Sequence, residues 1–169
     1  TPQRIRLSSI NPIYIDDGFI EIVSRSRKIT KHLHIPLQCG SDRILEKMGR
    51  PYTRHMIIDI INRLHASIED IAIGIDIITG FPSEDDNAFM ETYRLIELID
   101  IYYLHIFPYS PREGTVASSM TPVAEPVKRQ RVYALRQLDT TKRKAFYMKF
   151  LNRKVNILPE EKKYNNFFM

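Results

Sequence analysis

The segment from Ile71 to Ile78 (Ile-Ala-Ile-Gly-Ile-Asp-Ile-Ile) is apolar at nearly every position, and Asp76 is its only charged residue. Strands with one solvent-exposed face alternate between apolar and polar residues. Strands covered on both faces, as in parallel sheets, have continuous apolar sequences. The run therefore predicts a buried strand of a parallel sheet. Because parallel strands need crossover connections, helices are expected on either side of it.

The rest of the chain alternates between strand and helix patterns. Apolar residues at helical spacing with Ser, Thr or Asp caps predict the helices, and short apolar or alternating runs predict the strands. The predicted strands are 4–9, 32–37, 71–78, 102–107 and 155–158, and the predicted helices are 17–28, 41–48, 53–64, 83–99 and 124–152. The first four strands with their helices are half of a closed (β/α)8 barrel or part of an open doubly wound sheet.

The composition excludes several protein classes. The chain has 169 residues, of which 43% are apolar and 27% charged. These values are ordinary for a globular domain and exclude general disorder. No apolar run approaches the roughly 20 residues that span a membrane. The N-terminal Thr-Pro-Gln-Arg has neither an initiator Met nor an apolar signal core, so we expect a piece of a larger protein without a secretory signal.

Cys39 is the only cysteine. A single thiol excludes a disulfide framework, which fits a reducing compartment, and we expect a cytoplasmic location. One thiol is also too few for a cubane iron–sulfur cluster, which needs about three or four. The five histidines form no H-E-x-x-H pair. We interpret His32 and His34, on one face of a predicted strand, as structural or general polar groups rather than metal ligands.

Positive charge is concentrated near the C-terminus. Residues 128–154 contain ten basic residues and one acid, Asp139, for a net charge of +9, whereas the rest of the chain carries −4. The basic residues are Lys128, Arg129, Arg131, Arg136, Lys142, Arg143, Lys144, Lys149, Arg153 and Lys154. This basic segment predicts contact with a polyanion, and the alternative is a solvated helix face.

Polar residues and glycines follow the carboxyl ends of the predicted strands, where active sites of parallel α/β folds lie. The four ends carry Ser8–Ser9, Gln38–Ser41, Thr79–Pro82 and Phe107–Ser110. Gln38 offers a donor and an acceptor that suit ribose hydroxyls. A buried Asp76 needs donors such as a ribose hydroxyl or Arg50. Gly80 allows close approach of a flat ligand. Each residue also has a plainer interpretation. The amide of Gln38 would cap a loop, Asp76 would form a structural ion pair, Arg50 would be solvated and Gly80 would only allow a turn.

Six motifs occur in collinear order between about residue 4 and residue 158. They are Arg6-Leu-Ser-Ser-Ile-Asn-Pro12, His32-Leu-His-Ile-Pro-Leu-Gln38, Gly40-Ser-Asp-Arg-Ile-Leu45, Met48-Gly-Arg-Pro-Tyr-Thr53, Asp76-Ile-Ile-Thr-Gly-Phe-Pro82 with Glu84, and Phe107-Pro-Tyr-Ser-Pro-Arg112 with Gly114-Thr115. Together they resemble the radical S-adenosylmethionine (SAM) methylthiotransferases that modify tRNA. Within that family, the first motif and Leu104–Ser110 are similar to the branch acting on threonylcarbamoyladenosine.

The resemblance implies an α/β fold, the C-terminal half of a partial (β/α)6 TIM-like barrel. Residues 1–152 would form the half-barrel and the long helix, and residues 153–169 would begin a small RNA-binding β domain called TRAM. SAM is the implied cofactor, with Gln38 at its ribose and Arg50 at its methionine carboxylate. Asp76 would support the ribose or Arg50, and the strand that ends at Gly80 would lie along the adenine, near Phe107. tRNA is the implied partner, through Lys128, Arg129, Arg131, Arg136, Lys142, Arg143 and Lys144.

The family's cluster-binding C-x3-C-x2-C loop, its N-terminal domain and most of TRAM have no counterpart in this sequence. The resemblance therefore implies two [4Fe–4S] clusters whose ligands lie outside this chain, and a piece that is inactive alone. Cys39 and Ser83 stand where the family usually has Ser and Gly. The implied reaction is methylthiolation at C2 of N6-threonylcarbamoyladenosine-37 in tRNA. The alternatives are the isopentenyladenosine-37 branch and a catalytically silent nucleic-acid-binding module.

Overall fold

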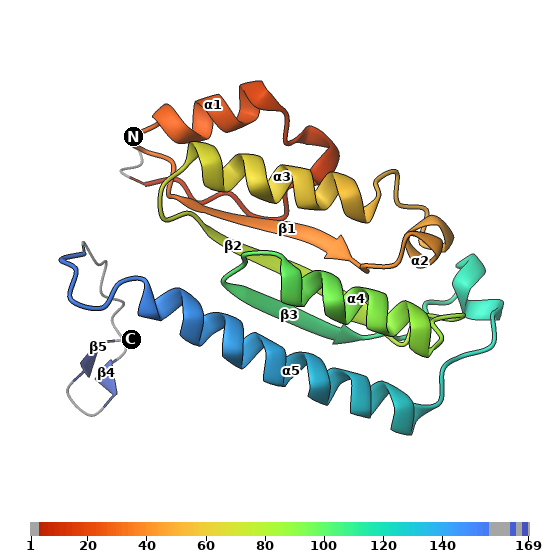
Figure 1. The fold of residues 1–169 in the computed structure, drawn as a ribbon. Helices are drawn as coiled ribbons and strands as arrows, with labels where there is room; N and C mark the ends of the chain where they lie inside the picture. Colours follow the sequence, from red (N-terminus) through yellow and green to blue (C-terminus); the bar gives the residue numbers. More distant parts are fainter. Residues whose placement is uncertain (1–3, 156–162, 165–166, 169) are drawn as a thin grey trace.

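A three-stranded parallel sheet forms the centre of the protein (Figure 1). We describe a computed structural model over residues 4–155, 163–164 and 167–168. The strands are β1 (His32–Gln38), β2 (Ala72–Thr79) and β3 (Tyr103–Pro108), in the order β1-β2-β3. The predicted buried run is thus the central strand, and the parallel α/β architecture is confirmed.

Helices follow the strands as the sequence predicted. They are α1 (Asp17–Arg25), α2 (Asp42–Lys47), α3 (Arg54–Ser67), α4 (Asp86–Leu98) and α5 (Glu125–Met148), with short 3-10 turns η1 (Pro12–Tyr14) and η2 (Val116–Ser119). The side chains of Asp16 and Thr53 cap α1 and α3. The helix predicted from residue 83 begins later, because Asp85 caps α4 by accepting from the backbone N–H of Ala88 at 2.8 Å. Ser83 has a φ of +71°.

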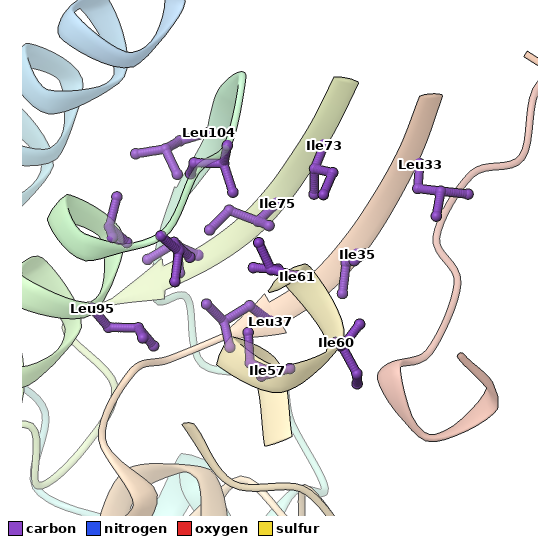
Figure 2. Close-up of a cluster of buried hydrophobic side chains, with 14 of the residues drawn as sticks. Leu33, Ile35, Leu37, Ile57, Ile60, Ile61, Ile73, Ile75, Leu95 and Leu104 are labelled. Carbon is purple, nitrogen blue, oxygen red and sulfur yellow. The ribbon is translucent and has the colours of Figure 1, made fainter. Parts of the chain in front are cut away.

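One face of the sheet, here called the helix face, is packed against the helices. Figure 2 shows Leu33, Ile35 and Leu37 of β1 and Ile73 and Ile75 of β2 in one cluster with Ile57 and Ile61 of α3 and Leu95 of α4. These side chains are nearly or fully buried. Successive side chains of a strand point to opposite faces, so the residues between them lie on the other side. That side, here called the pocket face, carries His34, Gln38, Asp76, His105 and Phe107.

The long helix α5 runs beside the edge strand β3 (Figure 1). Leu135 and Leu138 of α5 join the hydrophobic core. The carboxylate of Asp139 accepts a hydrogen bond from the backbone N–H of Leu104 at 2.7 Å. The only acid of the basic segment therefore satisfies an edge-strand donor, which fixes α5 along β3.

The predicted strand at 4–9 is wrong. Only Ile5 forms a β-bridge, with Ile29, and the described part of the sheet has three strands rather than four. The alternating pattern is present, but a φ of +55° at Ser9 breaks the extended backbone. The backbone N–H of Ile10 then bonds to the carbonyl of His34 at 2.9 Å, beside β1.

The C-terminal end contains a short antiparallel pair, β4 (Lys163–Tyr164) with β5 (Phe167–Phe168). Of the predicted strand 155–158, Val155 lies outside any strand, and 156–158 lie outside the described residues. The predicted domain boundary near residue 152 therefore stays a prediction. Among the described residues, no helix is both long enough and apolar enough to cross a membrane.

Candidate functional site

A pocket of about 770 Å³ lies on the pocket face at the carboxyl ends of the strands. Gln38 from the end of β1, Asp76 from β2 and Phe107 from β3 line it, and Arg50 reaches it from the turn after α2. The structure thus brings together four of the five residues that the sequence singled out. Their role toward SAM stays a prediction.

Gln38 has an unusual backbone for a strand residue. Its φ is +71°, and the pairing of β1 with β2 shifts register between Ile35 and Gln38. Positive φ at a non-glycine residue costs about 1–3 kcal/mol, and such positions gather at binding sites. Irregularities of this kind re-aim side chains. The shift therefore leaves Gln38 lining the pocket instead of continuing a regular ladder.

Two buried polar atoms of the pocket have no hydrogen-bond partner among the described residues. They are Nε of Arg50 and the hydroxyl of Tyr109. Gly49, at a φ of +65°, ends α2 and positions Arg50. Tyr109 is held through its backbone N–H, which bonds to the carbonyl of Thr79 at 2.8 Å. A buried donor without an acceptor costs about 1–3 kcal/mol. The two groups therefore fit a polar or anionic ligand such as SAM.

Asp76 has partners that the sequence did not predict. Its Oδ1 lies 2.9 Å from Nε2 of His34 and 3.4 Å from Nδ1 of His105. Arg50, the predicted donor, is not among the described ion-pair partners of Asp76. The two histidines lie on the neighbouring strands, so sheet geometry supplies them. Their separation from Asp76 in sequence hid the cluster from pattern analysis.

Glycine is needed at position 80 because the side chain of Lys128 packs directly against it. A Cβ at this position would lie 2.2 Å from Cγ of Lys128, and the φ of Gly80 is +78°. Its backbone N–H donates to Oε2 of Glu84 at 2.6 Å. Gly80 does not line the pocket among the described residues, so its proposed place along the adenine rests on the resemblance alone.

Glu84 anchors a buried network behind the pocket. Its carboxylate accepts from Nη1 of Arg131 at 2.8 Å, and Nη2 of Arg131 pairs with Asp86 at 2.8 Å. Burial raises the pKa of Glu84 even though the Gly80 N–H and the Arg131 guanidinium act in the opposite direction. The network joins the start of α4 to α5.

Several basic side chains of the basic segment are buried or paired within the protein, so the segment does not form one exposed basic surface. Lys128 and Arg131 are buried, Lys128 pairs with Glu125, and Lys142 donates to the carbonyls of Glu97 and Ile99. Arg143 pairs with Asp139 and covers the rings of Tyr102 and Tyr103. These four of the seven predicted RNA contacts therefore hold α5 against the domain. The other three, Arg129, Arg136 and Lys144, are exposed and form no ion pair with a described residue.

Cys39 does not fit a cluster or a nucleophile. It is fully buried, and its sulfur lies 3.3 Å from Oγ1 of Thr92. Burial raises the pKa of the thiol, which disfavours the reactive thiolate. With one cysteine in the chain, no residue set here matches a [4Fe–4S] cluster.

A second hollow, of about 440 Å³, lies toward the amino ends of the strands. Arg6, His32, Tyr103 and Arg143 line it together with His34 and His105. Burial and the neighbouring Arg6 lower the pKa of His32 to about 4. His32 is therefore neutral at physiological pH.

Comparison with known proteins places this geometry in a family. Residues 5–96, more than half of the chain, match the model of the radical SAM superfamily. The chain is 42% identical over 160 residues to threonylcarbamoyladenosine tRNA methylthiotransferase MtaB of Bacillus subtilis (strain 168), covering 94% of this chain and 36% of that protein. It is 35% identical over 158 residues to tRNA-2-methylthio-N(6)-dimethylallyladenosine synthase of Oceanobacillus iheyensis, covering 93% of this chain and 30% of that protein.

The fold comparison agrees. Coproporphyrinogen III oxidase (HemN) of Escherichia coli, a radical SAM enzyme, superposes with a TM-score of 0.61 at 16% identity, over 86% of this chain and 32% of that chain. The protein spans about a third of the length of the curated relatives it matches. The three parallel strands and their helices agree with part of a TIM-like barrel. The chain belongs to the radical SAM superfamily.

Proposed function

We propose that this chain is the SAM-binding, C-terminal part of a cytoplasmic enzyme that methylthiolates adenosine-37 of tRNA. The observation that carries this proposal is the pocket at the strand ends. It combines Gln38 and Asp76 with the buried Nε of Arg50 and hydroxyl of Tyr109, which have no hydrogen-bond partner in the part of the chain that the structure describes. Support for the reaction comes from the names of the relatives, which are tRNA methylthiotransferases and synthases of methylthio nucleosides.

Each pocket residue has a proposed role toward SAM. The guanidinium of Arg50 forks onto the methionine carboxylate, which it matches in shape and charge. The amide of Gln38 exchanges hydrogen bonds with the ribose hydroxyls, and Asp76 accepts from one of them. Phe107 covers the apolar part of the ligand. Bound here, SAM would supply the radical chemistry of the reaction, and Arg50, Gln38 and Asp76 would hold and orient it.

Binding of SAM to this chain tests the pocket assignment directly. Isothermal calorimetry is expected to give saturable binding that Arg50→Ala weakens at least about tenfold, the size of one lost charge-assisted hydrogen bond. Arg25→Ala is the matched control, because Arg25 lies exposed on α1 and far from the strand ends in sequence. Equal affinity of the wild type and Arg50→Ala contradicts the assignment.

We further propose N6-threonylcarbamoyladenosine-37 as the substrate. A threonylcarbamoyl group carries a carboxylate, for which His34, His105 and Arg112 offer N–H donors. The second candidate is isopentenyladenosine-37, which the aromatic lining of Phe81, Phe107 and Tyr109 favours. Nucleoside mass spectrometry of tRNA from cells lacking the gene decides between them. Loss of the methylthio threonylcarbamoyl nucleoside alone supports the first, and loss of the isopentenyl one supports the second.

The exposed cations of α5 are the proposed tRNA contacts. Of the seven predicted contacts, Arg129, Arg136 and Lys144 are exposed and form no ion pair with a described residue. Because phosphate contacts release counterions, Arg136→Glu with Lys144→Glu is expected to lower tRNA affinity and flatten its salt dependence. Filter binding at several salt concentrations measures both, with Arg25→Glu as control. An unchanged slope means that α5 presents only a solvated face.

A further inference from the structure

Three ligand-type side chains from three strands meet at one point on the pocket face. They are His34 on β1, Asp76 on β2 and His105 on β3. Asp76 lies directly opposite His105 in the parallel register, and His34 lies opposite Gly74, two residues before Asp76. Because side chains alternate along a strand, this register places all three on the same face.

The separations of the three ligand atoms suit a bound cation. Oδ1 of Asp76 is 2.9 Å from His34 Nε2 and 3.4 Å from His105 Nδ1, and all three atoms lie within 4.8 Å of one another. Metal bonds of about 2.0–2.2 Å put neighbouring ligand atoms about 3.0–3.5 Å apart in octahedral or tetrahedral sites. The two distances from Asp76 Oδ1 to the imidazole nitrogens therefore match the spacing of ligand atoms in a metal site.

His34 provides an independent observation. Its imidazole is about nine-tenths buried, with 10% of the side chain exposed. Its Nε2 has no hydrogen-bond partner among the described residues, although Asp76 Oδ1 is 2.9 Å away. Whenever Nε2 carries no proton, its lone pair and the carboxylate oxygen repel each other. A cation between them removes the conflict and gives both atoms a partner.

We propose that His34, Asp76 and His105 bind one divalent transition-metal ion. Two imidazoles and one carboxylate are a ligand set of Zn²⁺ and of Fe²⁺, and three protein ligands leave coordination positions open. His105 is half exposed and lines the second hollow, so an ion can enter from solvent. The ion would use Oδ1 of Asp76, which leaves the second carboxylate oxygen for the ribose hydroxyl proposed above.

Zn²⁺ alone, without SAM or tRNA, is the probe. The chain is freed of metal with a chelator, and Zn²⁺ is titrated at pH 7.5 in a calorimeter. We expect one equivalent to bind and to raise the melting temperature, since a ligand of the folded state stabilises it. Binding is expected to weaken strongly at pH 5.5, where protons compete for the imidazoles. Co²⁺ in place of Zn²⁺ is expected to give visible ligand-field absorption.

Variants decide whether these residues are the ligands. His105→Gln and Asp76→Asn are each expected to lower the Zn²⁺ affinity at least tenfold. His105 is half exposed, so His105→Gln keeps the test valid if Asp76→Asn does not fold. His55→Gln is the matched control, because His55 is exposed on α3. The proposal is overturned if the wild type binds no stoichiometric Zn²⁺, if His105→Gln binds as well as the wild type, or if His55→Gln loses as much.

Discussion

The two faces of the central sheet are built from alternating residues of the same strands, yet they differ in kind. The helix face is formed by Leu and Ile side chains that are almost completely buried (Figure 2). The pocket face carries His34, Asp76 and Gln38, with two hollows along it. Hydrophobic burial therefore fixes the strands from one side, and the other side is left to hold polar groups in defined positions.

The largest expected effect is a difference in stability between substitutions on the two faces of the sheet. Ile75→Ala removes a fully buried side chain from the helix face and is expected to lower the free energy of unfolding by about 2–5 kcal/mol. Ile78→Ala, on the pocket face of the same strand, removes a half-buried side chain and is expected to cost about 1 kcal/mol. Urea denaturation measures both. Equal losses would show that the pocket face also carries the fold.

A smaller effect is expected at the strand end. Gly80→Ala puts a methyl group against the buried Lys128 stem at positive φ, and about 1–3 kcal/mol of stability is expected to be lost. Gly114→Ala has nearly the same φ, +80°, but open space around it, and isolates the backbone cost. Combining Gly80→Ala with Lys128→Ala should recover the steric part. If Gly80→Ala and Gly114→Ala cost the same, the contact with Lys128 is not decisive.

The last expected effect is a pH dependence from the pocket face. The unfolded chain binds the His32 proton near pH 6.5, whereas the folded chain binds it only near pH 4. The free energy of unfolding should therefore fall as pH drops from 6.5 toward 4, by less than about 1.4 kcal/mol per pH unit for this group. His32→Gln is expected to flatten that slope in denaturation series at pH 7.5, 6 and 5. An unaltered slope assigns the acid sensitivity to other groups.

The sequence predicted the helix face better than the pocket face. Apolar runs and capping residues suffice to locate β1, β2, β3 and the five helices, because burial and caps act locally. The wrong strand at 4–9 has the same alternation, but only Ile5 finds a backbone partner. Alternation alone does not reveal whether a partner strand is available.

The pocket residues were predictable as a group, but their contacts were not. Gln38, Asp76 and Phe107 follow from the rule that parallel strands end at one edge. The cluster of Asp76 with His34 and His105 depends on strand register, which no local pattern encodes. Likewise, charge counting treats Arg131 and Arg136 alike, although one is buried against Glu84 and the other is exposed.

The attachment of α5 turns this helix into a spacer of fixed length. Its first turn is held where Lys128 packs on Gly80, and its middle is held where Asp139 accepts from the edge of β3. A helix rises about 1.5 Å per residue, so Arg129 and Lys144 stand about 22 Å apart along the axis. The backbone of α5 would therefore fix the distance between the strand-end pocket and a polyanion bound by both Arg129 and Lys144. One turn inserted after Arg143 would move Lys144 about 5.4 Å farther along the axis and would leave both anchors in place.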